Sequence, residues 1–92
     1  MNILDFINTG KDNAITREEL TRATGISDRA IRRDINEAFK RGEIVINLGY
    51  GYFKPMPNKE DHLVKEYLNI EKARVKDENR KIRMMERYLE DV

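Results

Sequence analysis

The sequence contains no cysteine and no tryptophan, and His62 is its one histidine. The absence of cysteine excludes disulfide bridges, thiolate metal sites and cysteine nucleophiles, and a lone histidine cannot build a metal site. No apolar run approaches the ~20 residues that a membrane span requires, and the N-terminal segment lacks the features of a signal peptide. We therefore expect a cytoplasmic protein without a metal, a cofactor or a small-molecule ligand, and without contact with a membrane.

An excess of charge of one sign is also absent, because 18 Lys and Arg residues stand against 17 Asp and Glu residues. The net charge of +1 therefore says nothing about partners, and the arrangement of the charges has to be used instead. Proline occurs only at positions 55 and 57, and no glycine or proline follows. The chain of 92 residues thus predicts one small domain, residues 1–57, followed by one long helix, residues 58–92.

The N-terminal part begins with several closely spaced apolar residues, which predict a short first helix over residues 3–7. Residues 14–15 are expected to form a minimal strand. Thr16 and Glu19 have the spacing of a capping box, in which each side chain accepts a hydrogen bond from the backbone amide of the other residue. A second helix of about two turns is therefore expected directly after Thr16.

A glycine turn separates this helix from a longer one. Gly25 is the residue type expected at a left-handed helix C-cap, and Ser27 can cap a new helix that runs to Lys40 or Arg41. A short helix, a tight turn that contains glycine and a longer capped helix together form the outline of a helix-turn-helix.

The helix over residues 28–41 has one apolar side and one basic side when its residues are placed at about 100° intervals. Its apolar residues are Ile31, Ile35, Ala38 and Phe39, which we expect to pack inward. The opposite side, called here the basic face, consists of Arg29, Arg32, Arg33, Asn36 and Lys40, and acidic residues only flank it. A merely solvated polar surface is the alternative interpretation. On the second helix of a helix-turn-helix, however, such a face favours a recognition helix in the major groove, where arginine pairs with guanine, asparagine with adenine, and lysine neutralises phosphate.

Residues 43–47 are rich in β-branched residues, residues 51–54 can pair with them, and Gly49 and Gly51 supply a tight turn between the two, so this region predicts a β-hairpin. Either Tyr52 or Phe53 is expected to close the core, because the two side chains point to opposite faces of the strand. The chain is therefore predicted to be mainly α with a small β-hairpin: a winged helix-turn-helix domain followed by a long C-terminal helix. The candidate DNA-binding residues are the basic face together with Ser27 at the start of its helix and Tyr50 and Lys54 of the hairpin.

Four segments of the chain carry a resemblance to a known family. They are residues 4–15, Ile-Thr-Arg-Glu-Glu-Leu at 15–20, Thr-Gly-Ile-Ser-Asp-Arg-Ala-Ile-Arg at 24–32 and Gly-Tyr-Phe at 51–53. Over roughly its first two thirds, the chain resembles the small winged-helix proteins of phages and prophages of Gram-positive bacteria. The resemblance implies a winged helix-turn-helix fold and a DNA-binding role, which Arg29, Arg32 and Arg33 would carry.

The C-terminal part predicts a helix that Asn58 caps and that is ~50 Å long, too long for a lone element on a small domain. Its apolar residues recur every seven positions at Leu68, Val75, Ile82 and Leu89, and the companion positions hold Val64, Glu71, Glu78, Met85 and Val92. This pattern is typical of a coiled coil with an acidic middle. We therefore expect a homodimer, parallel or antiparallel, in which Leu68, Val75, Ile82, Met85 and Leu89 make the contacts. A single frayed helix is the alternative.

A second apolar group in this helix, Leu63, Tyr67 and Ile70, is expected to pack back on the N-terminal domain. Paired acids such as Glu18 and Glu19 have no basic or metal-binding neighbours, so no enzymatic activity is expected. The sequence favours a sequence-specific, double-stranded DNA-binding protein, a transcriptional regulator of phage or mobile-element origin. The alternative is a protein–protein interaction module whose long helix docks on a phage or host protein.

Overall fold

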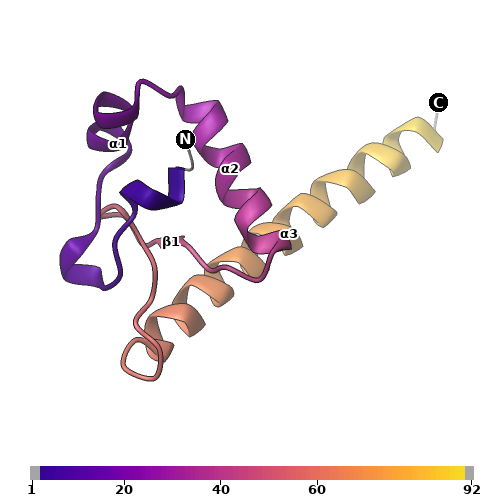
Figure 1. The fold of residues 1–92 in the computed structure, drawn as a ribbon. Helices are drawn as coiled ribbons and strands as arrows, with labels where there is room; N and C mark the ends of the chain where they lie inside the picture. The colour runs from indigo at the N-terminus through magenta and orange to yellow at the C-terminus, as the bar shows by residue number, and fades with distance from the viewer. Residues whose placement is uncertain (1–2, 91–92) are drawn as a thin grey trace.

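The computed structural model describes residues 3–90 of the chain and is mainly helical (Figure 1). In chain order its elements are η1 (Ile3–Phe6), η2 (Lys11–Asn13), α1 (Arg17–Thr24), α2 (Asp28–Lys40), β1 (Ile46–Asn47), β2 (Tyr52–Phe53) and α3 (Asp61–Glu90). A small antiparallel hairpin and a long C-terminal helix are therefore confirmed. Val92, one of the expected seam positions, lies outside the described residues.

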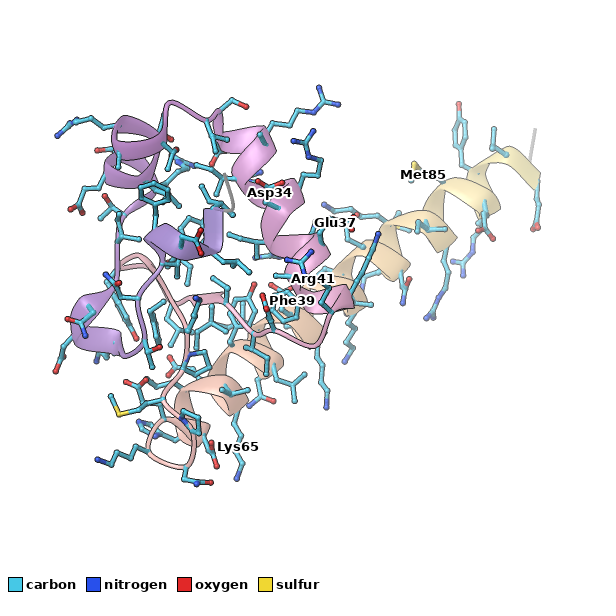
Figure 2. All side chains as sticks on the ribbon, in the orientation of Figure 1. Asp34, Glu37, Phe39, Arg41, Lys65 and Met85 are labelled. Atoms are coloured by element: carbon cyan, nitrogen blue, oxygen red, sulfur yellow. The ribbon has the colours of Figure 1, made fainter. Side chains whose placement is uncertain are left out.

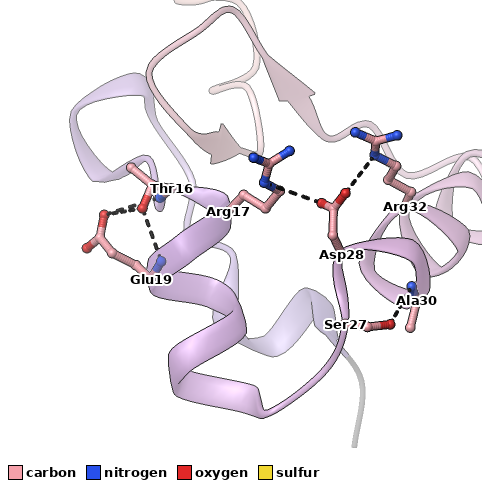
Figure 3. Close-up of polar contacts among 7 residues, drawn as sticks. All are labelled: Thr16, Arg17, Glu19, Ser27, Asp28, Ala30 and Arg32. Carbon is pink, nitrogen blue, oxygen red and sulfur yellow. Dashed lines mark hydrogen bonds and ion pairs between the residues drawn. The ribbon is translucent and has the colours of Figure 1, made fainter.

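The capping box at the start of α1 is confirmed. The Thr16 hydroxyl oxygen accepts a hydrogen bond from the Glu19 amide at 3.1 Å, and the Glu19 carboxylate accepts one from the Thr16 amide at 3.3 Å (Figure 3). The Thr16 hydroxyl also donates to this carboxylate at 2.8 Å, and these bonds, the hydroxyl first, hold the pKa of Glu19 below its ordinary value. Gly25 ends α1 with a left-handed φ of 70°, as expected for a C-cap.

The longer helix α2 also begins and ends as the sequence predicts. The Ser27 hydroxyl oxygen accepts a hydrogen bond from the Ala30 amide at 3.3 Å, and Lys40 is the last helical residue. The inward side of α2 consists of Ile31, Ile35 and Ala38, which are buried. The expected packing of Phe39 is wrong: its side chain is 42% exposed, because it lies at the edge of the buried side, where no neighbouring element covers it fully.

The hairpin is shorter than predicted, because the ladder consists of only two residue pairs, Ile46 with Phe53 and Asn47 with Tyr52. The Asn47 side chain ends it: its carbonyl oxygen accepts hydrogen bonds from the Gly49 amide at 2.8 Å and the Gly51 amide at 3.3 Å. Of the two candidate aromatic residues, Phe53 closes the core with no exposed surface. The expected strand at residues 14–15 is reduced to one bridge between Ile15 and Tyr52.

Two buried clusters hold these elements together. The larger one joins η1, α1, α2 and Val45, and the smaller one consists of Ile46, Phe53 and Leu63. The smaller cluster attaches the first turns of α3 to the hairpin, and Tyr67 packs against it, as expected. Ile70 does not take part, since its side chain is 43% exposed, and that prediction is wrong.

The expected Asn58 cap of α3 is also wrong, because the helix begins three residues later, at Asp61. Asn58 adopts a left-handed φ of 67°, and its amide donates to the Asp61 carboxylate at 3.2 Å. Glu60 accepts hydrogen bonds from the Lys11 amide at 2.9 Å and the Met56 amide at 2.7 Å. These two backbone amides, Lys11 first, hold the pKa of Glu60 below its ordinary value. The start of α3 is thereby tied to η2.

Beyond its first turns α3 leaves the rest of the protein (Figure 1). Its 30 residues span about 45 Å at 1.5 Å per residue. Within residues 68–90 only Glu71 is partly buried, and every other residue is exposed. The C-terminal half of the helix is thus available to a partner over its whole circumference.

Candidate nucleic-acid interface

The basic face of α2 is exposed along its whole length, and it divides into two parts. At about 100° per residue, Arg29, Arg33 and Lys40 lie within about 30° of the direction directly opposite the buried side. Arg32 and Asn36 lie on the flank of the helix that is turned toward the hairpin and α3, and both line hollows there. Arg29, Arg33 and Lys40 can therefore enter a groove of a bound ligand. Arg32 and Asn36 can contact groups of the ligand that lie in the hollows beside the helix.

Flanking acids reach into the basic face and form ion pairs with three of its cations. The pairs are Arg32 Nε with Asp28 Oδ2 at 3.3 Å, Arg33 Nε with Asp34 Oδ1 at 3.7 Å, and Lys40 Nζ with Glu37 Oε1 at 3.0 Å. The three cationic side chains remain 65–73% exposed, and ion pairs of this kind contribute little to stability. Arg29 forms no ion pair within residues 3–90. These cations can therefore exchange their carboxylates for another anion at low cost.

A hollow of about 360 Å³ lies between the start of α1, the start of α2 and the hairpin. Arg17 and Arg32 both line it, and the carboxylate of Asp28 lies between them, 3.6 Å from Arg17 Nε and 3.3 Å from Arg32 Nε (Figure 3). Sequence reasoning missed Arg17, because it considered that residue only as part of the capped helix start. The available signal was its position in the first turn of the helix that precedes the glycine turn.

Tyr50 lines this same hollow from the tip of the hairpin. Its ring is half-exposed, stacks on Phe53 at a centroid distance of 6.0 Å, and has the Lys11 ammonium 5.0 Å from its centroid. Lys11 is a second cation that the sequence analysis missed. Lys54, in contrast, lies at the other end of β2, where its backbone bonds to Asn8 and Gly10, and it lines neither hollow beside α2.

A second hollow, of about 660 Å³, separates the flank of α2 from α3. Arg32 and Asn36 line one wall, and Tyr67, Glu71 and Arg74 line the other. Burial, followed by the negative charge of Glu71, raises the pKa of Tyr67, and Glu71 Oε1 lies 3.1 Å from Arg74 Nη1. The contribution of α3 to this surface was not predicted, because the sequence analysis assigned its residues to a dimer seam or to the core.

The remaining DNA-binding candidate, Ser27, lies at the N-terminus of α2. Its oxygen is used for the cap, and its hydroxyl hydrogen has no acceptor among the described residues. The structure therefore places Ser27 on the same helix as the basic face and brings Arg17, Arg32 and Tyr50 to one hollow. Lys11 lies beside Tyr50, and Lys54 lies apart from these residues.

The expected dimer contacts form an uncovered apolar stripe. Leu68, Val75, Ile82, Met85 and Leu89 are between 46% and 71% exposed. No element within residues 3–90 covers them.

Other kinds of site find no support in the described part of the chain. Among residues 3–90, no cluster of three His, Asp or Glu residues could hold a metal ion. The helices of this part are too polar or too short to cross a membrane. No family model matches the chain, and neither a curated protein nor a solved structure matches it.

Proposed function

We propose that the protein is a winged helix-turn-helix protein that binds double-stranded DNA and regulates transcription for a phage or another mobile element. In this proposal α1 crosses the DNA backbone, α2 is the recognition helix in the major groove, and the hairpin is the wing. One observation carries the proposal: the three outermost side chains of α2 are Arg29, Arg33 and Lys40, all cations. The resemblance of the sequence to small winged-helix proteins of phages and prophages supports the same assignment.

The dimensions of α2 suit this role. Its 13 residues form a rod of about 20 Å, and the major groove, about 12 Å wide, admits one α-helix. Arg29 and Arg33 would then reach base edges, where arginine bonds bidentately to guanine, and Asn36 suits adenine. Lys40, at the end of the helix, would neutralise a phosphate without reading sequence.

The hollow beside the start of α2 would accept the DNA backbone. Arg17 and Arg32 converge there on Asp28 at 3.6 and 3.3 Å, so the carboxylate holds both guanidinium groups in place before a ligand arrives. A phosphate that enters the hollow competes with Asp28 for the two arginines. The hydroxyl of Tyr50, which lines the hollow, can donate a further hydrogen bond to a phosphate oxygen, and that of Ser27, outside the hollow at the N-terminus of α2, can donate one to a neighbouring phosphate.

A second candidate function is protein–protein interaction through α3. The exposed apolar residues along this helix favour it, and the balanced charge of the chain gives no long-range attraction to DNA. In that case the cations of α2 would be a solvated surface.

Duplex binding by variants with matched charge separates the two functions. The test variant carries Arg29→Ala, Arg32→Ala and Arg33→Ala. The control carries Lys76→Ala, Arg83→Ala and Arg87→Ala, which remove the same charge from exposed positions of α3. We expect the test variant to lose affinity for duplexes selected from a random pool, and the control to retain most of it. Equal affinity of the two variants would refute the recognition-helix assignment.

A further inference from the structure

Apolar side chains are exposed along the whole of α3, and each end of the helix also borders a hollow. At the start of the helix, Ile44, Met56 and Val64 line a hollow of about 520 Å³, together with Lys65. At the far end, Met84, Met85, Tyr88 and Leu89 surround a shallow apolar hollow and are 60–71% exposed. Lys65 and Met85 mark the two ends in Figure 2. Within residues 3–90 the far surface is uncovered, whereas at the start of α3 Ile44 and Met56 are exposed and Val64 is half-buried.

A second copy of the chain can cover Val64 at the start of α3 and Leu89 at its far end at the same time. A twofold axis makes residue i of one copy contact residue j of the other, and residue j contact residue i. If the axis crosses the middle of α3, the far end of each helix lies on the start of the other. An unrelated partner would have to present a matching apolar stripe about 30 Å long.

The acidic middle of α3 decides the direction of such a pair. Leu68, Val75, Ile82 and Leu89 repeat every seven residues, and Val64, Glu71, Glu78 and Met85 occupy the companion positions. In a parallel pair each companion residue faces its own copy, so Glu71 and Glu78 would form two layers of opposed carboxylates. Like charges that face each other in a seam are destabilising.

We propose that α3 pairs antiparallel with α3 of a second copy, in the register in which the numbers of facing residues add to 153. Leu68 then faces Met85 of the second copy, and Val64 faces its Leu89. In the middle, Val75 faces Glu78 of the second copy, so no glutamate faces another. This assignment does not depend on DNA binding.

Charges beside the seam agree with this register. Within one helix, Arg74 Nη1 lies 3.1 Å from Glu71 Oε1, and Lys81 Nζ lies 3.7 Å from Glu78 Oε1. Each seam glutamate therefore already has a cation, which offsets the approach of Arg74 to Lys81 of the second copy. At each end, Lys65 lies beside Glu86 of the second copy, a favourable pair. A parallel arrangement would instead bring Lys81 beside Glu86, so the direction is decided by the seam glutamates and not by these flanking charges.

The cysteine-free sequence allows a direct test by disulfide trapping. Leu68→Cys and Met85→Cys are made separately in the full-length chain, where both side chains are exposed and tolerate replacement. After mild oxidation with oxidised glutathione, we expect a covalent dimer in the mixture of the two variants. We expect no covalent dimer when either variant is oxidised alone. Cysteines bridge only where their Cα atoms lie about 4.4–6.8 Å apart.

A matched control pair lies on the opposite side of the helix in the same register. Ala73→Cys and Arg80→Cys also add to 153 but face away from the seam, so their mixture should give no covalent dimer. Covalent dimers from each single seam variant alone would show a parallel pair and overturn the proposal. Sedimentation of the unmodified protein as a monomer at tens of micromolar, the range in which a weak seam associates, would also overturn it.

Discussion

Asp28→Asn is the substitution that tests the proposed DNA interface most sharply, because it should change stability and DNA affinity in opposite directions. Asp28 is the first residue of α2, and its carboxylate lies within 3.6 Å of Arg17 Nε and 3.3 Å of Arg32 Nε. The folded protein loses an acid at a helix N-terminus and two exposed ion pairs. Together these losses should lower the free energy of unfolding by about 1 kcal/mol.

The same substitution removes the anion that competes with phosphate for Arg17 and Arg32. Exposed ion pairs are worth about 0.2–1 kcal/mol each, so freeing both arginines should tighten duplex binding by about 2- to 30-fold. One added positive charge at the interface should steepen the dependence of affinity on salt concentration by about one unit. Fluorescence anisotropy at several salt concentrations measures both changes, and urea denaturation measures stability.

Asp77→Asn is the matched control for this experiment, since it removes one acid from an exposed position of α3. Its affinity should stay close to that of the unmodified protein. If Asp28→Asn bound DNA no better than Asp77→Asn, then Arg17 and Arg32 would not contact the duplex, and the proposed role of the hollow between α1, α2 and the hairpin would be wrong.

Three further predictions concern the base contacts, the dimer and the start of α3. Arg33→Ala should cost about 1–3 kcal/mol on the preferred site and relax base choice at one position; selection from random duplexes that returned an unchanged preference would contradict this. Lys65→Glu should weaken self-association about 2- to 30-fold through its two symmetric pairs, and adding Glu86→Lys to the same chain should restore it, as measured by sedimentation. Backbone amides, that of Lys11 first, hold the pKa of Glu60 below 4.5, so its stabilisation is complete above that pH and is lost as the pH falls through the lowered pKa. Glu60→Gln should therefore destabilise the protein at neutral pH and lose less stability in acid than the unmodified chain; equal acid sensitivity in denaturation experiments would refute this role of Glu60.

The features that the sequence predicts correctly are those whose causes lie within a few residues. The capping box joins Thr16 to Glu19, the left-handed φ of 70° is a property of Gly25 itself, and Ser27 caps α2 by bonding to Ala30. The one cap that was placed wrongly has a local cause as well. Asn58 adopts a left-handed backbone, whereas an N-cap residue is extended, and its amide donates to Asp61, the first residue of the helix.

The features that the sequence does not reveal depend on contacts between distant segments. Arg17 becomes part of the candidate interface because Asp28, across the glycine turn, holds its guanidinium group. Phe39 stays exposed because no described element fully covers the edge of α2 on which it lies. Glu60 accepts a hydrogen bond from Lys11, 49 residues earlier in the chain. A helical wheel contains none of this information, since it shows one element without its neighbours.

The antiparallel pairing and the DNA-binding proposal together predict the form of the DNA site. In the proposed register, Leu68 and its copy are 17 positions apart along the pair of helices, or about 25 Å. Successive major grooves on one side of a duplex are about 34 Å apart, so two α2 helices that are level with Leu68 of their own chains must each lie about 11 Å to the side of the seam to enter DNA together. A hollow lies between the flank of α2 and α3, so α2 does not pack directly on this part of α3. With that spacing, an antiparallel dimer would present two recognition helices one helical turn apart, and its site should be an inverted repeat with half-sites about 10 bp apart.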